Sequence, residues 1–193
     1  MISPLDTDTK DWIQAISWVG ASIGIVVAIL KYVSEQKQNR CQQELQLDQR
    51  KLELRWKQAE AAKKMLDEML SDPAAQAAMT MLDWNDLDFE IKPGVKAKIW
   101  EEDYMRALRT ENLDFSDKEA YIRRCFDNLF YYMAMMEHYI KSGLVLLEDV
   151  VFPLDYYLAI MNRNRDTFDT FLERYGQTRT LDFMARLERK NRA

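Results

Sequence analysis

The chain contains a single histidine, His138, the residue that the familiar nucleophilic mechanisms would need as a general base. Its neighbours along a helix, Tyr131 and Lys141, complete neither a Ser-His-Asp nor a Cys-His arrangement. Cys125 lies more than three helical turns before it. We therefore predict a structural role for His138 and no catalytic residue.

Arginines near the histidine raise the separate question of a metal-independent ribonuclease. One type uses an arginine followed four to six residues later by a histidine, but Arg123 and Arg124 lie too far before His138 for that spacing. An enzyme remains an alternative only if the fold brings His138 beside Arg123, Asp127 or an acid from another copy.

Acidic residues cluster between residues 83 and 90, as they do in calcium-binding loops. The cluster lacks the central glycine and the final glutamate of such a loop, so a surface or capping role is expected. The chain also contains no phosphate-binding glycine loop, no HExxH motif and no cysteine pair. No cofactor or metal is predicted, and Cys41 and Cys125 are expected to be free thiols. The acidic residues of the cluster between residues 83 and 90 are Asp83, Asp86, Asp88 and Glu90.

Residues 12–32 contain a run without charged residues that matches the roughly 20 residues needed to cross a bilayer. Trp12 and Tyr32 stand at its ends, where aromatic rings favour the headgroup level. The sequence therefore predicts a single transmembrane helix with the lipid bilayer as a partner, although a buried core helix is the alternative.

Small residues recur every four positions inside this segment, at Gly20, Gly24 and Ala28, and Ser17 and Ala21 widen the strip. This spacing lets two membrane helices approach closely. We expect the segment to self-associate, the alternative being a smooth face without a partner.

Charges around the segment predict its orientation. The leader is acidic, which argues against a cleaved signal peptide, and more basic residues follow the segment than precede it. The positive-inside rule then places residues 1–11 outside and residues 71–193 in the cytoplasm of a bacterial inner membrane. The net charge of −5 gives no reason to expect a nucleic-acid partner. The basic residues that follow the uncharged run of the membrane segment are Lys31, Lys37 and Arg40.

Residues 33–70 contain neither proline nor glycine and are expected to extend the membrane helix without a break. Leu45, Leu52, Ala59 and Leu66 recur at seven-residue spacing. This stripe predicts either a face that docks on the following domain or an oligomer seam, and both uses can coexist. Pro73 should end the helix and start the next one, with Asp72 as its cap.

The remaining residues, 71–193, predict a helical domain. Ser116 and Glu119 form a capping box before a central helix that should run to Lys141 and stop at Gly143. Further helices are expected over residues 147–162, 166–175 and 180–190, and residues 85–98 are expected to form a loop. The predicted fold class is therefore all-α, a transmembrane helix continuing into a long helix and then a cytoplasmic helical bundle.

The stretch from Asn128 to Gly176 resembles a poorly characterised bacterial family of small proteins with one N-terminal membrane helix. The matching elements are Tyr131-Tyr132, Glu137, Ser142-Gly143-Leu144 and Glu148-Asp149. That resemblance covers roughly Ala62 to the C-terminus and implies no activity. The layout also resembles the accessory protein of RNA-targeting CRISPR systems, which assembles as a ring-shaped membrane pore.

Together these patterns predict a non-enzymatic homo-oligomer that forms a pore or perturbs the membrane, with antiviral defence as one setting. The competing interpretation is a membrane-tethered adaptor that binds a cytoplasmic protein partner.

Overall fold

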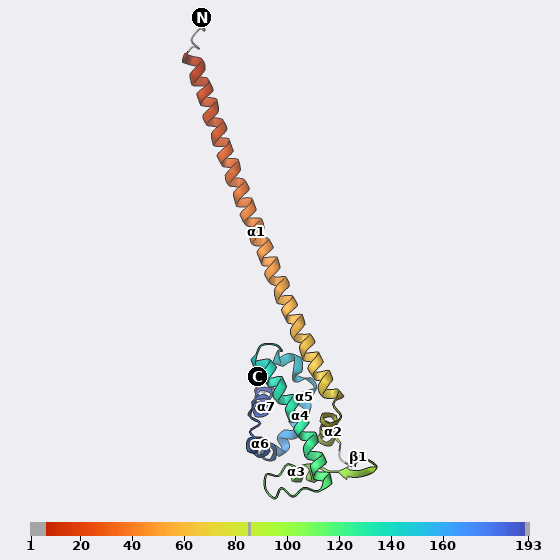
Figure 1. The fold of residues 1–193 in the computed structure, drawn as a ribbon. Coiled ribbons are helices and arrows are strands. Elements are labelled where there is room, and N and C mark those ends of the chain that lie inside the picture. Colours follow the sequence, from red (N-terminus) through yellow and green to blue (C-terminus); the bar gives the residue numbers. More distant parts are fainter. Residues whose placement is uncertain (1–6, 85, 192–193) are drawn as a thin grey trace. The chain divides into compact units, whose positions relative to one another are not determined.

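The computed structural model describes residues 7–84 and 86–191, and within them the side chains of residues 7–17, 19–29, 153 and 191 lie outside the description. The described chain is mostly helical (Figure 1). It forms two compact units, residues 1–54 and 55–193. Residues 55–71 therefore pack with the helices that follow them.

The first helix, α1 (Thr7–Ser71), ends where the sequence predicts. Asp72 caps the next helix, α2 (Pro73–Asp83), because its carboxylate accepts hydrogen bonds from the amides of Ala74 and Ala75 at 2.9 and 2.8 Å. Proline fits the first helical position, since the amide it lacks would be unpaired there.

The central helix of the bundle is α4 (Asp117–Lys141), and its predicted start is confirmed. Ser116 and Glu119 exchange the hydrogen bonds of a capping box, with the Ser116 amide donating to Glu119 Oε2 at 2.9 Å. Gly143 follows the helix with φ of +72°, a conformation that glycine adopts without steric cost. Within the bundle, α4 runs between α2 on one side and α6 and α7 on the other (Figure 1).

The other helices surround α4 and close an aromatic core. Rings of Phe126, Phe130, Phe168 and Phe171 are fully buried and pack with centroids 5.8 to 6.2 Å apart. The surrounding helices are α3 (Glu101–Ala107), α5 (Leu147–Met161), the 3-10 turn η1 (Asn162–Asn164), α6 (Arg165–Arg174) and α7 (Thr178–Asn191).

A β-hairpin replaces the loop expected over residues 85–98, so the loop prediction was wrong, although the described chain is mostly helical as the predicted fold class requires. Strand β1 (Leu87–Lys92) pairs antiparallel with β2 (Val95–Ile99), with Phe89 opposite Ala97. Gly94 supplies the positive φ of the turn, +75°. Phe89 and Ile99 point into the core and are buried, so burial of alternate residues holds the strands in place.

Two buried carboxylates in α4 are neutralised by arginines. Glu137 is fully buried and accepts two hydrogen bonds from Arg186 of α7, at 2.9 and 2.7 Å. Glu119 accepts from Arg109 at 2.6 Å. The Ser116 amide and the Arg109 guanidinium lower the pKa of Glu119 to about 2. The pair with Arg186 joins α4 to α7, and the pair with Arg109 joins it to the segment between α3 and α4.

Candidate interaction surface

Large apolar side chains of α1 are exposed on more than one side of the helix, and one of these sides also carries a tryptophan. Leu45, Leu52 and Trp56 are 58, 71 and 70% exposed, and Ala59 is exposed as well. At 3.6 residues per turn, these four positions lie within about 60° of one another around the helix axis. We call Leu45, Leu52, Trp56 and Ala59 the α1 stripe. Apolar side chains gathered on one surface mark an interaction site more often than single exposed ones do.

The structure places the residues of the predicted seam differently. Leu45, Leu52 and Ala59 are exposed, whereas Leu66 is half-buried against the core. Trp56 was missed in the sequence, although its position four residues after Leu52 places it on the same side. Counting the i+4 positions as well as the seven-residue repeat would have found it.

A different side of α1 packs on the bundle. Ala62, Met65 and Met69 are buried in the core, and their positions centre roughly a third of a turn away from the stripe. Packing on the bundle therefore leaves the stripe side of Trp56 and Ala59 uncovered.

Polar contacts fix the same part of α1 to the start of α5. The Arg55 guanidinium donates to both carboxylate oxygens of Asp149, at 2.6 and 2.7 Å. Glu148 accepts a further bond from it at 3.2 Å, and the Gln58 amide donates to the Gly143 carbonyl at 2.9 Å. Such a two-pronged arginine–carboxylate pair is directional, so it sets the rotation of this segment about its own axis.

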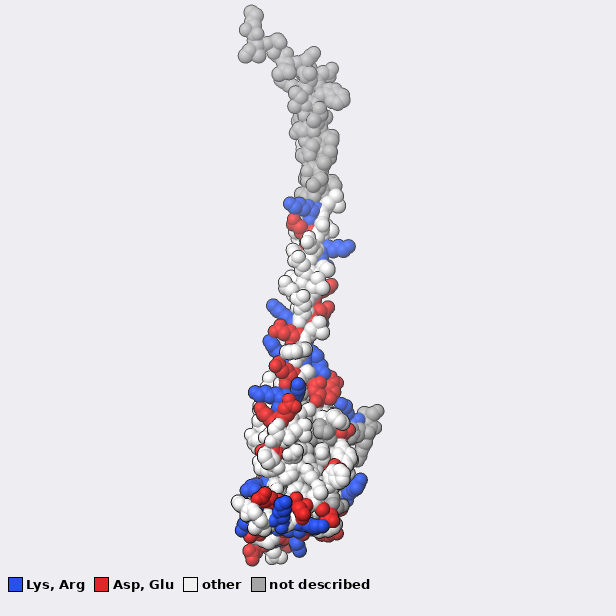
Figure 2. Space-filling view, turned by 90° about the vertical axis from the view of Figure 1, so that its right-hand side faces the viewer, with Lys and Arg blue, Asp and Glu red and all other residues white. Residues whose placement is uncertain are grey.

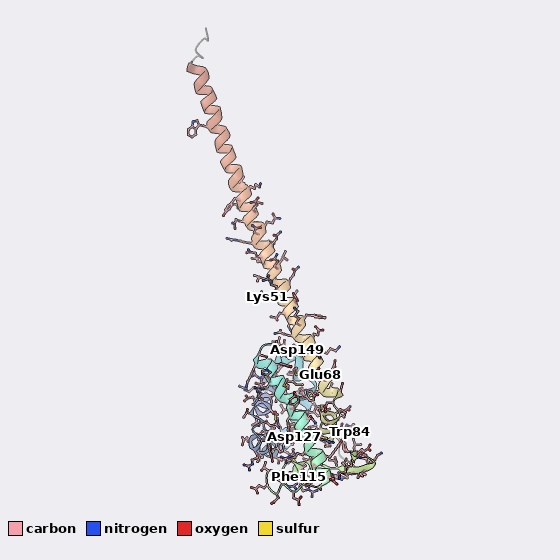
Figure 3. The ribbon with its side chains drawn as sticks, viewed as in Figure 1. Lys51, Glu68, Trp84, Phe115, Asp127 and Asp149 are labelled. Carbon is pink, nitrogen blue, oxygen red and sulfur yellow. The ribbon has the colours of Figure 1, made fainter. Side chains whose placement is uncertain are left out.

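The bundle has an exposed aromatic group of its own on α2 and α5. Phe152 is 81% exposed, and Trp84 and Tyr156 are more than half exposed. The Tyr156 hydroxyl donates to Asp83, which joins the two helices. Trp84 lies at the end of α2 beside the hairpin (Figure 3), and Figure 2 shows few charged side chains across the middle of this side of the bundle.

A kink in α5 exposes Phe152. The backbone of Phe152 leaves the helical region, with φ of −84° and ψ of 131°. A proline disfavours helical geometry in the residue before it, so Pro153 accounts for the kink. The backbone therefore adopts a kink inside α5, and the helix continues beyond it.

His138 is exposed, and its ring centroid lies 5.8 Å from that of Tyr139. Arg123 and Asp127 lie on the same helix, about 22 and 16 Å away along its axis at 1.5 Å per residue. Arg123 instead lies over the rings of Phe115, Phe171 and Tyr175, 4.6 to 4.8 Å from their centroids. It therefore acts as a packing residue.

The acidic residues near the hairpin are engaged in local contacts. Asp83 accepts from Tyr156, Asp86 pairs with Lys98 at 2.5 Å, and Glu90 accepts from the Gly94 amide at 2.8 Å. Within residues 7–84 and 86–191, no group of three potential ligands is placed to hold a metal ion.

Most of the predicted membrane segment lies outside the described side chains. This holds for Trp12, Ser17, Gly20, Gly24 and for two further members of the strip, Ala21 and Ala28. Tyr32 is described and is exposed. Among the residues that could be assessed, no helix is both long enough and apolar enough to span a membrane.

Comparison of the chain with protein-family models, curated proteins and solved structures found no match.

Proposed function

We propose that the protein is a non-enzymatic homo-oligomer anchored in a bacterial inner membrane, in which neighbouring copies associate through α1. In this proposal residues 12–32 cross the bilayer and the bundle lies on the cytoplasmic side. Close packing of these segments forms a pore or perturbs the membrane. Either activity is expected of a membrane effector, including one in antiviral defence.

The α1 stripe is the observation that carries this proposal. Full burial of a large apolar side chain stabilises by about 1.5–3 kcal/mol. Scaled by the exposed fractions of 58, 71 and 70%, covering Leu45, Leu52 and Trp56 in two copies contributes about 6–12 kcal/mol. Association costs on the order of 4–15 kcal/mol in lost motional freedom.

These two ranges overlap, so association of free copies in solution would be marginal. Anchoring in one membrane raises the effective concentration of the helices and removes much of that cost. The stripe is therefore suited to copies that share a bilayer, which is why the membrane anchor and the oligomer belong to one proposal.

The proposal is tested with the full chain and a double variant, Gly20→Leu with Gly24→Leu. The added side chains would hold the membrane helices apart, so the particle mass in detergent and the depolarisation of expressing cells should both fall. Val26→Leu, on the opposite side of an ideal helix, is the control and should change neither. An unchanged mass and unchanged depolarisation in the double variant would refute the proposal.

A membrane-tethered adaptor is the second candidate, favoured by the exposed aromatic group on α2 and α5. An adaptor would use Phe152 and Trp84 to bind a cytoplasmic protein. Phe152→Ser with Trp84→Ser should then remove a protein that copurifies with the wild-type chain, while the mass of the oligomer stays the same. Tyr131→Ser, at a similarly exposed tyrosine on α4, is the control. Equal losses in both variants would count against this candidate.

A further inference from the structure

We propose that the α1 helices of two copies pair through the stripe as a parallel coiled coil, in register. This inference rests on the self-association proposed above and adds its contact surface, direction and register.

The spacing of the stripe identifies a helix as the partner. Leu45, Leu52 and Ala59 repeat every seven residues, and Trp56 occupies the intervening position four residues after Leu52. A seven-residue repeat faces a partner continuously only when the partner is a helix of the same period, wound around it. A second copy of α1 supplies that period.

The size of the stripe favours a partner in the same membrane. Covering one leucine removes roughly 60–120 Å² of apolar surface, and covering a tryptophan removes about 150–250 Å². With the exposed fractions of Leu45, Leu52 and Trp56, two copies bury roughly 350–650 Å² of apolar surface. Stable complexes of free proteins bury about 1,200–2,000 Å² in total. The stripe is too small to recruit a free protein but is sufficient for a copy held nearby by its own anchor.

Gln49 gives the direction and the register. It lies between Leu45 and Leu52 near the same side of α1 and is exposed. In a parallel pair in register, each Gln49 amide meets the other and the leucines meet leucines. An antiparallel pair, or a shift by one layer, would set Gln49 against apolar side chains and leave its amide unpaired. A polar residue within an apolar seam specifies alignment in this way.

Cys41 provides a built-in reporter of the pairing. Its thiol is exposed, four residues before Leu45, and falls on the side of the stripe. Cys125 is fully buried, so it does not compete with Cys41 in forming disulfides between copies. In a parallel pair in register the two Cys41 side chains lie at the same height on the two helices and flank the seam.

The test oxidises the full chain in detergent micelles with diamide. Two Cys41 thiols form one disulfide, and diamide accepts the two protons and two electrons as it is reduced to its hydrazine. We expect a covalent dimer in non-reducing electrophoresis, lost in Cys41→Ser. When Leu45→Cys or Leu52→Cys is added to Cys41→Ser, each variant should form a disulfide-linked dimer of two identical chains.

Leu47 and Leu54 provide matched controls on the same helix. They are leucines with similar exposure, 54 and 58%, but lie on roughly the opposite side of α1. Leu47→Cys and Leu54→Cys should each give less than about a tenth of the dimer that Leu45→Cys and Leu52→Cys give. Coexpressed Leu45→Cys and Leu52→Cys chains should cross-link less to each other than to themselves, because equivalent positions meet in a parallel pair in register. An antiparallel pair would reverse that preference.

The outcomes separate this inference from the function it rests on. Equal cross-linking on both sides of α1, or a preference for the mixed pair, would overturn the parallel seam. If the particle mass shows an oligomer at the same time, the proposed function still stands. A monomeric mass with no cross-linking would overturn both.

Discussion

The buried pair of Glu137 and Arg186 gives the sharpest test of how the bundle is held together. In Arg186→Met, the apolar stem is largely kept but the guanidinium that neutralises a fully buried carboxylate is lost. Removing one partner of a buried ion pair costs about 3–5 kcal/mol. Arg186 is 33% exposed and Lys141 remains 3.5 Å from Glu137, so we expect a smaller loss, about 2–3 kcal/mol.

The loss should come from the stranded charge and not from the missing arginine itself. Glu137→Leu added to Arg186→Met removes that charge and should restore stability to within about 1 kcal/mol of the wild type. Urea unfolding of the full chain, followed by near-ultraviolet circular dichroism, measures the free energies. Arg189→Met, on an exposed site of α7, is the matched control and should cost little. A double variant no more stable than Arg186→Met would refute the reasoning.

Two further predictions concern titration and thiol reactivity. Hydrogen bonds from the Ser116 amide and Arg109 lower the pKa of Glu119 from 4.5 to about 2, so its contribution to stability is present above the unfolded pKa and is lost as pH falls from 4.5 towards 2. Glu119→Gln should flatten the fall in melting temperature over that interval, and an unchanged slope would contradict the assignment. Burial raises the pKa of the Cys125 thiol to about 11, so a maleimide at pH 7 should label Cys41 and leave Cys125 unlabelled until the bundle is unfolded. Mass spectrometry of the labelled peptides checks this, and equal labelling in the folded protein would show that Cys125 is accessible.

The helix ends were predictable because their signals are local. Asp72 with Pro73, Ser116 with Glu119 and Gly143 each act through hydrogen bonds or backbone preferences within a few residues. Such signals are complete in the sequence, and the structure places a helix boundary at each of them.

The hairpin was harder to predict because its stability comes from distant contacts. Leu87, Phe89 and Ile91 alternate with charged residues, but the Pro93-Gly94 turn and the acidic cluster favoured a loop. A lone two-stranded hairpin is barely stable, so the strands persist because Phe89 and Ile99 enter the core. That burial depends on the packing of α4, which a local pattern does not contain.

The side of α1 that meets the bundle likewise depends on tertiary contacts. The seven-residue pattern identified Leu45, Leu52 and Ala59 as one side of a helix. It does not contain the positions of Asp149 and Gly143, whose contacts with Arg55 and Gln58 orient this segment. Exposure of Trp56 and Ala59 is thus a property of the folded bundle and not of the repeat.

The buried carboxylate of Glu137 also affects the order in which the chain acquires its structure during synthesis. Its partner Arg186 leaves the ribosome 49 residues later, a delay of about 2–10 s at 5–20 residues per second. During that time α4 exposes an acidic group on the side that must become apolar core. Closure of the bundle therefore waits for α7, whereas α1 has already emerged. In the membrane-anchored form proposed above, this delay gives the N-terminal segment time to enter the bilayer before the folded bundle can hinder its delivery.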